Sequence, residues 1–298
     1  TAGISSVTLG IGNFIAGDEA GDSIVSGGNS NTLIGDAAGR DLTTGDNNVA
    51  VGRNSLRAST SSVGNTAVGM QSLFSNTTGS SNTAVGDNSL SANTTAANNV
   101  AVGGYALSTN TTGTANVAVG KIALRFNTTA DNNTAIGYSA LYANTTGASN
   151  TAVGTNSLLA NTTASNTTAV GHNALKSNTI PSNNTAVGYN ALQANTTGGV
   201  NSAFGNSAMY TNTTGYGNTA VGKNSLYTNN GNNNTALGHE ALELNTSGSS
   251  NVAVGRDALT ANTTASNNTA VGLSALAANT TGASNVAVGK SALSANTT

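Results

Sequence analysis

Several residue types are rare or missing in this chain of 298 residues, and each shortage excludes a class of protein. There is no Cys, no Trp and one Pro, there are four Phe, and charged residues make up 7% of the sequence. Without Cys, disulfides and thiolate metal sites are excluded, although the compartment is not fixed. With so few bulky side chains, a rounded globular core is not expected, and thin layered packing fits better.

Charge and hydropathy exclude two further classes. The net charge is −2, and the nine Lys and Arg residues are scattered, so we expect no nucleic-acid partner. The sequence has no apolar run long enough to span a bilayer, so we expect no membrane insertion. Thr1 follows no signal-like stretch, so we expect any export signal or anchoring domain to lie outside this sequence.

An internal repeat with a period of seventeen is the dominant feature of the sequence. A motif of the type Asn-Thr-Ala-Val-Gly ends in a glycine sixteen times, with fourteen intervals of seventeen positions and one of sixteen. These glycines are 35, 52, 69, 86, 103, 120, 137, 154, 171, 188, 205, 222, 238, 255, 272 and 289. We therefore expect a divergent N-terminal cap over residues 1–30 and about 16 tandem repeats over 31–298 that form one continuous rod.

Fixed columns within the repeat predict how one coil is built. Ala and then an apolar residue precede the glycine, Leu stands four residues after it, and Asn stands seven residues after it in most copies. These short segments predict strands and turns, because four or five residues are too few for a stable helix. The predicted fold is all-β: a parallel β-solenoid or β-roll of 17-residue coils, each advancing about 4.8 Å.

Two sets of columns are expected to hold such coils together. We expect an aliphatic core from the valines and leucines, with the neighbouring Ala and Ser columns forming a flat outer face. The core candidates are Val68, Val85, Val102, Val119, Leu73, Leu90, Leu107 and Leu124. We expect Asn side chains to form hydrogen-bonded ladders between coils. The ladder candidates are Asn65, Asn82, Asn99, Asn116, Asn133, Asn150, Asn76, Asn93, Asn110 and Asn127.

Repeats such as Asn184-Thr-Ala-Val-Gly-Tyr-Asn-Ala-Leu-Gln-Ala-Asn-Thr-Thr-Gly198 resemble the shaft repeats of phage tail-fibre proteins. They are more loosely similar to the head domains of trimeric autotransporter adhesins, whose coils are shorter. The resemblance implies a homotrimeric, left-handed β-roll fibre on a virion or an extracellular surface. Such a shaft would space or display an element that binds a host receptor or a surface glycan.

Candidate chemistry is sparse, and we expect no enzyme, no cofactor and no metal. His172 and His239 lie four coils apart, roughly 19 Å at the strand spacing, with no acidic column expected beside them. An acidic group near the N-terminus suggests Ca²⁺ binding, but turn-forming aspartates are the favoured explanation. Its members are Asp18, Glu19, Asp22, Asp36, Asp41 and Asp46.

Three further surface features leave alternatives open. Asn-Thr-Thr sequences form N-glycosylation acceptors in most coils, yet a ladder requires unmodified Asn. Regular Thr columns suggest an ice- or glycan-binding solenoid, although a plain strand-forming role explains them too. Tyr210 and Tyr227, in consecutive coils, are candidates for surface sugar binding. A self-polymerising extracellular filament is the third functional alternative.

Overall fold

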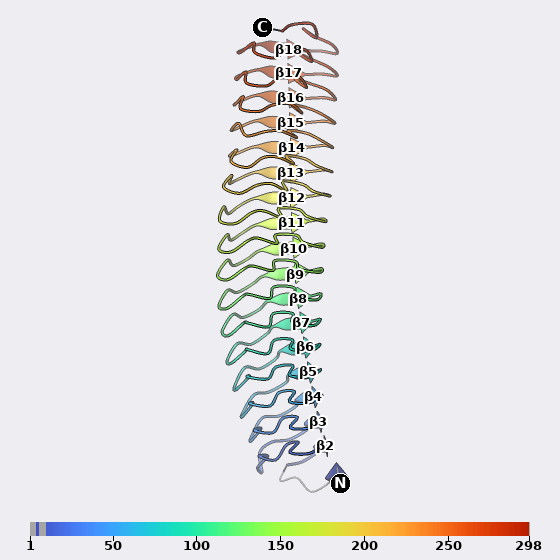
Figure 1. The fold of residues 1–298 in the computed structure, drawn as a ribbon, viewed down its shortest axis with the longest axis vertical. Helices are drawn as coiled ribbons and strands as arrows, with labels where there is room; N and C mark the ends of the chain where they lie inside the picture. Colours follow the sequence, from blue (N-terminus) through green and yellow to red (C-terminus); the bar gives the residue numbers. More distant parts are fainter. Residues whose placement is uncertain (1–3, 6–9, 298) are drawn as a thin grey trace. The chain divides into compact units, whose positions relative to one another are not determined.

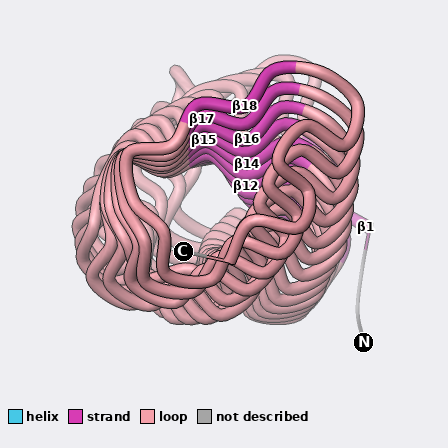
Figure 2. The backbone as a smooth tube through the Cα atoms, turned by 90° about the horizontal axis from the view of Figure 1, so that it is seen from above, coloured by secondary structure: helices cyan, strands magenta, loops and turns pink. Residues whose placement is uncertain are grey.

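The computed structural model describes residues 4–5 and 10–297, in two compact units, Thr1–Ser149 and Asn150–Thr298. Each unit is a stack of coils in which one short strand alternates with turns (Figures 1 and 2). The described residues contain no helix, and hence none that is long and apolar enough to cross a lipid bilayer. The predicted all-β parallel solenoid, with one coil for each sequence repeat, is confirmed.

Strands contribute only three residues to each coil. The first unit contains β1 Ile4–Ser5, β2 Phe14–Ala16, β3 Thr32–Ile34, β4 Val49–Val51, β5 Thr66–Val68, β6 Thr83–Val85, β7 Val100–Val102, β8 Val117–Val119 and β9 Thr134–Ile136. The second unit contains β10 Thr151–Val153, β11 Thr168–Val170, β12 Thr185–Val187, β13 Ser202–Phe204, β14 Thr219–Val221, β15 Thr235–Leu237, β16 Val252–Val254, β17 Thr269–Val271 and β18 Val286–Val288.

Strand pairing within each unit is parallel and follows the sequence repeat. Thr66 of β5 pairs with Thr83 of β6, one repeat further along the chain, and identical columns therefore stack on one another. The one interval of sixteen residues, between Gly222 and Gly238, shortens a turn and not a strand, because β14 and β15 still pair in register. Within the expected cap, β2 already pairs in parallel with β3, while Ile4–Ser5 pairs antiparallel to β2.

Two ladders of buried Asn side chains connect the coils within each unit. In the first, the Asn82 backbone N–H donates to Asn65 Oδ1 at 2.9 Å, and Asn82 Nδ2 donates to the Ala96 carbonyl at 2.9 Å. In the second, Asn93 Nδ2 donates to Asn76 Oδ1 at 2.8 Å. All ten ladder candidates are at most 1% exposed. Each side chain therefore satisfies polar groups that burial would otherwise leave without partners.

The first ladder also determines which strand residues face inward. The Asn before each strand points into the coil, so alternation turns the first strand residue outward, the second inward and the third outward. In β5, Asn65 and Ala67 are 0% exposed, whereas Thr66 and Val68 are partly exposed. The interior therefore contains Ala from the strand, opposite the Leu column.

The prediction that the valines lie in the core is wrong. Leu73, Leu90, Leu107 and Leu124 are fully buried. Val68, Val85, Val102 and Val119 are instead partly exposed on the outer side of the sheet. The Ala and Ser columns, expected outside, are buried, as Ala67, Ala106 and Ser72 show. The inward-pointing Asn imposes this alternation, and small Ala side chains let the strand lie close to the Leu column.

The first ladder has Thr in place of Asn at one position. Thr167 is buried and its backbone N–H donates to Asn150 Oδ1 at 3.0 Å, but its short side chain bonds back to the Ser165 carbonyl. By the pattern of the other coils, an Asn here would accept from the Asn184 N–H and donate to the Pro181 carbonyl.

We expect Thr167→Asn to stabilise the chain by about 1 kcal/mol, because it adds two buried hydrogen bonds and removes one. Urea unfolding followed by circular dichroism measures the change. Thr168→Asn, at the neighbouring outward position, is the control and should give no gain, since Asn is disfavoured in strands and finds no ladder there. Equal gains for both variants would contradict the ladder explanation.

Candidate functional site

The outer side of the sheet, here called the strand face, consists of the first and third residues of β3–β18. The third position is apolar in all sixteen strands and none of these side chains is buried; Ile136, Phe204 and Leu237 are 40%, 40% and 47% exposed. The first position is Thr, Val or Ser, and neither position is ever charged. The strand face is therefore a regular, uncharged surface with one outward apolar side chain per coil.

A second surface contains most of the chemical variety. It consists of the two residues after each strand-ending glycine and the residue after the Leu column, and we call it the variable groove. All nine Lys and Arg residues lie at its positions: Arg40, Arg53, Arg57, Lys121, Arg125, Lys176, Lys223, Arg256 and Lys290. Aromatic rings pack against them, with the Arg125 guanidinium 5.2 Å from the Tyr105 ring centre and Arg57 5.5 Å from Phe74.

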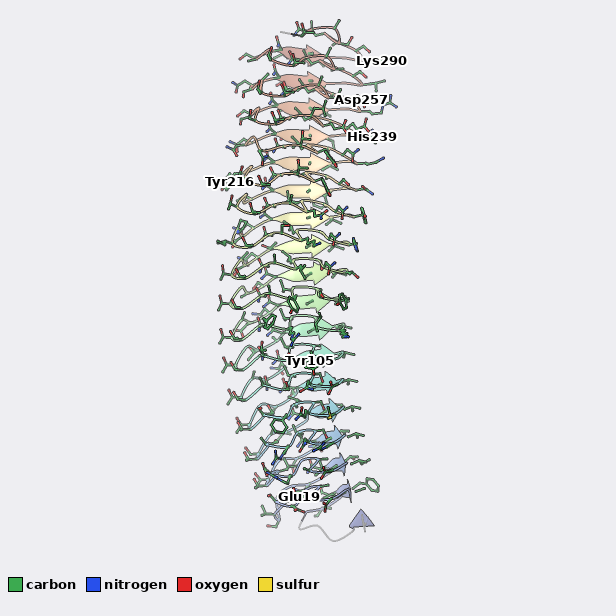
Figure 3. All side chains as sticks on the ribbon, viewed as in Figure 1. Glu19, Tyr105, Tyr216, His239, Asp257 and Lys290 are labelled. Atoms are coloured by element: carbon green, nitrogen blue, oxygen red, sulfur yellow. The ribbon has the colours of Figure 1, made fainter. Side chains whose placement is uncertain are left out.

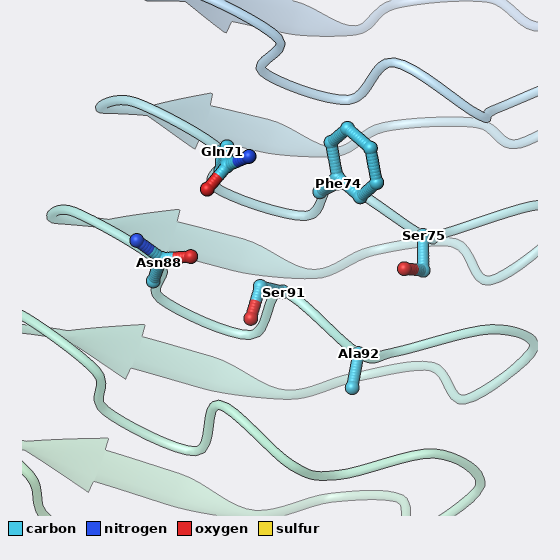
Figure 4. A pocket seen from close by; sticks show the side chains of 6 residues that line it. All are labelled: Gln71, Phe74, Ser75, Asn88, Ser91 and Ala92. Carbon is cyan, nitrogen blue, oxygen red and sulfur yellow. The ribbon is translucent and has the colours of Figure 1, made fainter.

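The groove forms a surface hollow of about 190 Å³ in the first unit, lined by six side chains (Figure 4). Gln71 and Phe74 come from one coil, and Asn88 and Ser91 come from the next coil. The hollow is smaller than the roughly 300–1,000 Å³ of typical small-molecule sites, and its lining includes no titratable side chain. Its polar groups are the amides of Gln71 and Asn88 and the hydroxyls of Ser75 and Ser91.

Tyr210 and Tyr227, the candidate sugar-binding pair, do lie together in the variable groove. Their ring centres are 5.2 Å apart with 16° between the planes, because they occupy the same column of stacked coils. His172 and Tyr189 stack in the same way, at 5.4 Å and 10°. Each ring covers one face of its partner, so a sugar would have only the outer faces and edges of a pair to contact.

The two histidines have different surroundings. His172 stacks on Tyr189, whereas His239 Nε2 lies 3.5 Å from Glu240 Oε1. Asp257, one coil further on, brings a carboxylate oxygen within 4.8 Å of the His239 and Glu240 ligand atoms. The expectation that His239 has no acidic neighbours is therefore wrong. Burial raises the pKa of nearby Glu243, and the charge of Glu240 raises it further.

The acidic group near the N-terminus is largely engaged in local pairing. Arg40 lies 2.9 Å from Asp41 and 3.4 Å from Glu19, and Arg53 lies 3.4 Å from Asp36. Asp46 Oδ1 accepts the Asn29 backbone N–H at 2.6 Å. These contacts fit the favoured expectation of turn-forming and solvated acidic residues.

The Asn-Thr-Thr acceptor column coincides with the second ladder. Its Asn residues from Asn76 to Asn279 are 0% exposed, and Asn110 Nδ2 donates both to Asn93 Oδ1 and to the Gly113 carbonyl. The nitrogen that a glycan would modify is thus enclosed and hydrogen-bonded. The following hydroxyl is also engaged, as Thr111 Oγ1 donates to the Thr128 carbonyl at 3.0 Å. The folded coils therefore enclose the acceptor Asn side chains from Asn76 to Asn279, whereas Asn296 is partly exposed.

Comparison with known proteins adds no family to this description. No protein-family model matches the chain, and no curated protein matches it.

Proposed function

We propose that this chain is a non-enzymatic fibre shaft whose copies associate side by side through the strand face. The observation that carries the proposal is the outward third strand position, which is apolar in all sixteen strands although its side chain is at least partly exposed in each. In a sheet with one face exposed to solvent, the outward strand positions are ordinarily polar. An apolar column along the coils of each unit, on an uncharged face, is typical of a surface that another protein covers.

The energetics of such an association favour a repeated interface. Covering one partly exposed Val contributes on the order of 1 kcal/mol. The loss of translational and rotational freedom, about 4–15 kcal/mol, arises once for each association. On a face with one apolar side chain per coil, every additional coil therefore adds to the favourable free energy of association. A single coil would contribute too little to offset the loss of freedom. The Ala and Ser columns, which were expected to form a flat outer face, cannot provide this interface, because they are buried.

The resemblance to phage tail-fibre shafts and trimeric adhesin heads suggests a homotrimer. In that role, the ladders and the sheet provide a stiff spacer, and the variable groove stays on the outside of the assembly. The fibre would lie on a virion or an extracellular surface and would hold a receptor- or glycan-binding element away from it.

The test is the mass of the full chain in solution, measured by light scattering during size exclusion. We expect three times the 28.9 kDa chain mass for the unmodified protein. Val102→Lys combined with Val119→Lys should give a single-chain mass, because two desolvated charges at the interface are costly. The control combines Met70→Lys and Asp87→Lys, both exposed in the variable groove, and should leave the trimer intact.

A single-chain mass for the unmodified protein would overturn the shaft proposal. It would favour the second candidate, an ice- or glycan-binding solenoid, for which the regular outward Thr residues of the strand face are the supporting observation. Thr66→Tyr with Thr83→Tyr should then abolish ice or glycan binding without loss of the β-sheet spectrum. An open-ended mass distribution would instead indicate a polymerising filament.

A further inference from the structure

His239, Glu240 and Asp257 form a cluster that the repeat itself brings together. His239 and Glu240 follow the glycine after β15, and Asp257 follows the glycine after β16. β15 and β16 pair with Leu237 beside Val254, so the residues after these strands lie on neighbouring coils. Figure 3 shows His239 and Asp257 projecting on the same side of the second unit, and the three ligand atoms lie within 4.8 Å of one another.

The composition of the second unit makes this cluster unusual. Residues 150–298 contain only three carboxylate side chains, Glu240, Glu243 and Asp257, and all three lie in two consecutive coils. One of the chain's two histidines lies with them. The nearby cations are Lys223 and Arg256, and Arg256 Nε contacts Asp257 Oδ2 at 3.0 Å. Scattered surface charges would not be expected to concentrate in this way.

The three ligand atoms lie near the spacing that a metal site requires. Zn²⁺ binds imidazole nitrogen and carboxylate oxygen at about 2.0–2.2 Å, which places ligands of a tetrahedral site roughly 3.4 Å apart. His239 Nε2 and Glu240 Oε1 are already 3.5 Å apart. The His239, Glu240 and Asp257 side chains are 44%, 32% and 25% exposed, and a metal ion would compete with Arg256 for the Asp257 carboxylate.

We propose that His239, Glu240 and Asp257 bind one divalent transition-metal ion of the zinc class, which ties two consecutive coils together. One imidazole with carboxylates suits Zn²⁺ and related ions, whereas Ca²⁺ and Mg²⁺ prefer oxygen ligands alone. Glu243 adds a further carboxylate to the same part of the groove. Because the ion would bind the folded coils and not the unfolded chain, it would also raise their stability. This proposal does not depend on the fibre function.

The test is calorimetric titration of the tag-free full chain with ZnCl₂. We expect one ion per chain, a weakening of at least about tenfold for His239→Asn, and a similar weakening for Glu240→Gln with Asp257→Asn. His172→Asn is the matched control, because His172 stacks on Tyr189 in the same column without carboxylate neighbours, and it should leave binding unchanged. ZnCl₂ should also raise the thermal unfolding midpoint of the unmodified chain but not that of His239→Asn.

Three results would overturn the proposal. The first is no Zn²⁺ binding to the unmodified chain. The second is binding that survives His239→Asn, or that CaCl₂ reproduces equally well, which would indicate a site without the imidazole. The third is binding that survives loss of both carboxylates, which would indicate a lone surface histidine. Because all the altered side chains are at the surface, an unchanged circular dichroism spectrum is expected to accompany each variant.

Discussion

Replacement of Gly103 by Ala is expected to destabilise the chain by at least about 3 kcal/mol. Gly103 has a φ of 131°, a backbone conformation that is almost restricted to glycine and costs other residues about 1–3 kcal/mol. A Cβ atom would also lie 2.6 Å from the Gly120 carbonyl oxygen and 2.7 Å from its carbon. These are backbone atoms of the next coil, so relief would require the coils to separate and their hydrogen bonds to lengthen.

The adjacent glycine provides the control. A Cβ on Gly104 would find its nearest neighbour, the Asp87 carbonyl oxygen, at 4.0 Å, which is an ordinary contact. Gly104→Ala should therefore be neutral or stabilising by up to about 1 kcal/mol, through loss of freedom in the unfolded chain. Urea unfolding of both variants at one fixed protein concentration measures the difference. Equal stability for the two would show that close stacking of the coils at Gly103 is not required.

The repeat and its ladders could be predicted from sequence because the period of the sequence determines which residues pair between stacked coils. Once every coil has the same length, identical residues lie above one another, and an Asn column becomes a ladder without further information. The absolute orientation of the strand was harder to predict, since alternation shows only that Ala67 and Val68 face opposite sides. The missing signal was Asn65, whose ladder role requires it to point inward and so places Ala67 inside.

The tyrosine pair, the His239 cluster and the strand face could be predicted from the sequence only in part. The proximity of Tyr210 and Tyr227 follows from their shared column, and the structure places them together. Glu240 and Asp257 share a column and His239 directly precedes Glu240, so the repeat places the three residues on two neighbouring coils but does not show that their ligand atoms approach one another. Their proximity depends on how the turn after each glycine directs neighbouring side chains, which the period alone does not specify. The uncharged strand face was overlooked because its valines were expected in the core.

Removal of a single ladder Asn is the second large effect that we expect. Asn116 Oδ1 accepts the Asn133 backbone N–H at 2.9 Å, and Asn116 Nδ2 donates to the Ala130 carbonyl at 2.8 Å. Asn116→Ala would leave the buried Asn133 N–H without this acceptor, and it would remove one of the two donors to the Ala130 carbonyl, which keeps Asn127 Nδ2 at 3.0 Å. A buried group that loses its partner costs about 1–3 kcal/mol and one lost hydrogen bond about 1 kcal/mol, so a decrease of about 2–4 kcal/mol in the free energy of unfolding is expected.

A double-mutant cycle separates the ladder from a general effect of losing Asn. Asn116 Nδ2 donates to Asn99 Oδ1 at 3.3 Å, and both single changes remove this hydrogen bond, so replacing both by Ala should cost less than the sum of the single changes, with a coupling of about 0.5–3 kcal/mol. The matched pair Asn48 and Asn116 belongs to the same column but is four coils apart, and its changes should be additive. Equal coupling in the two pairs would mean that the Asn columns act through the whole stack of coils. Coupling confined to neighbours would mean that each coil is secured by the hydrogen bonds of its own Asn, so that the stability of a stack grows coil by coil.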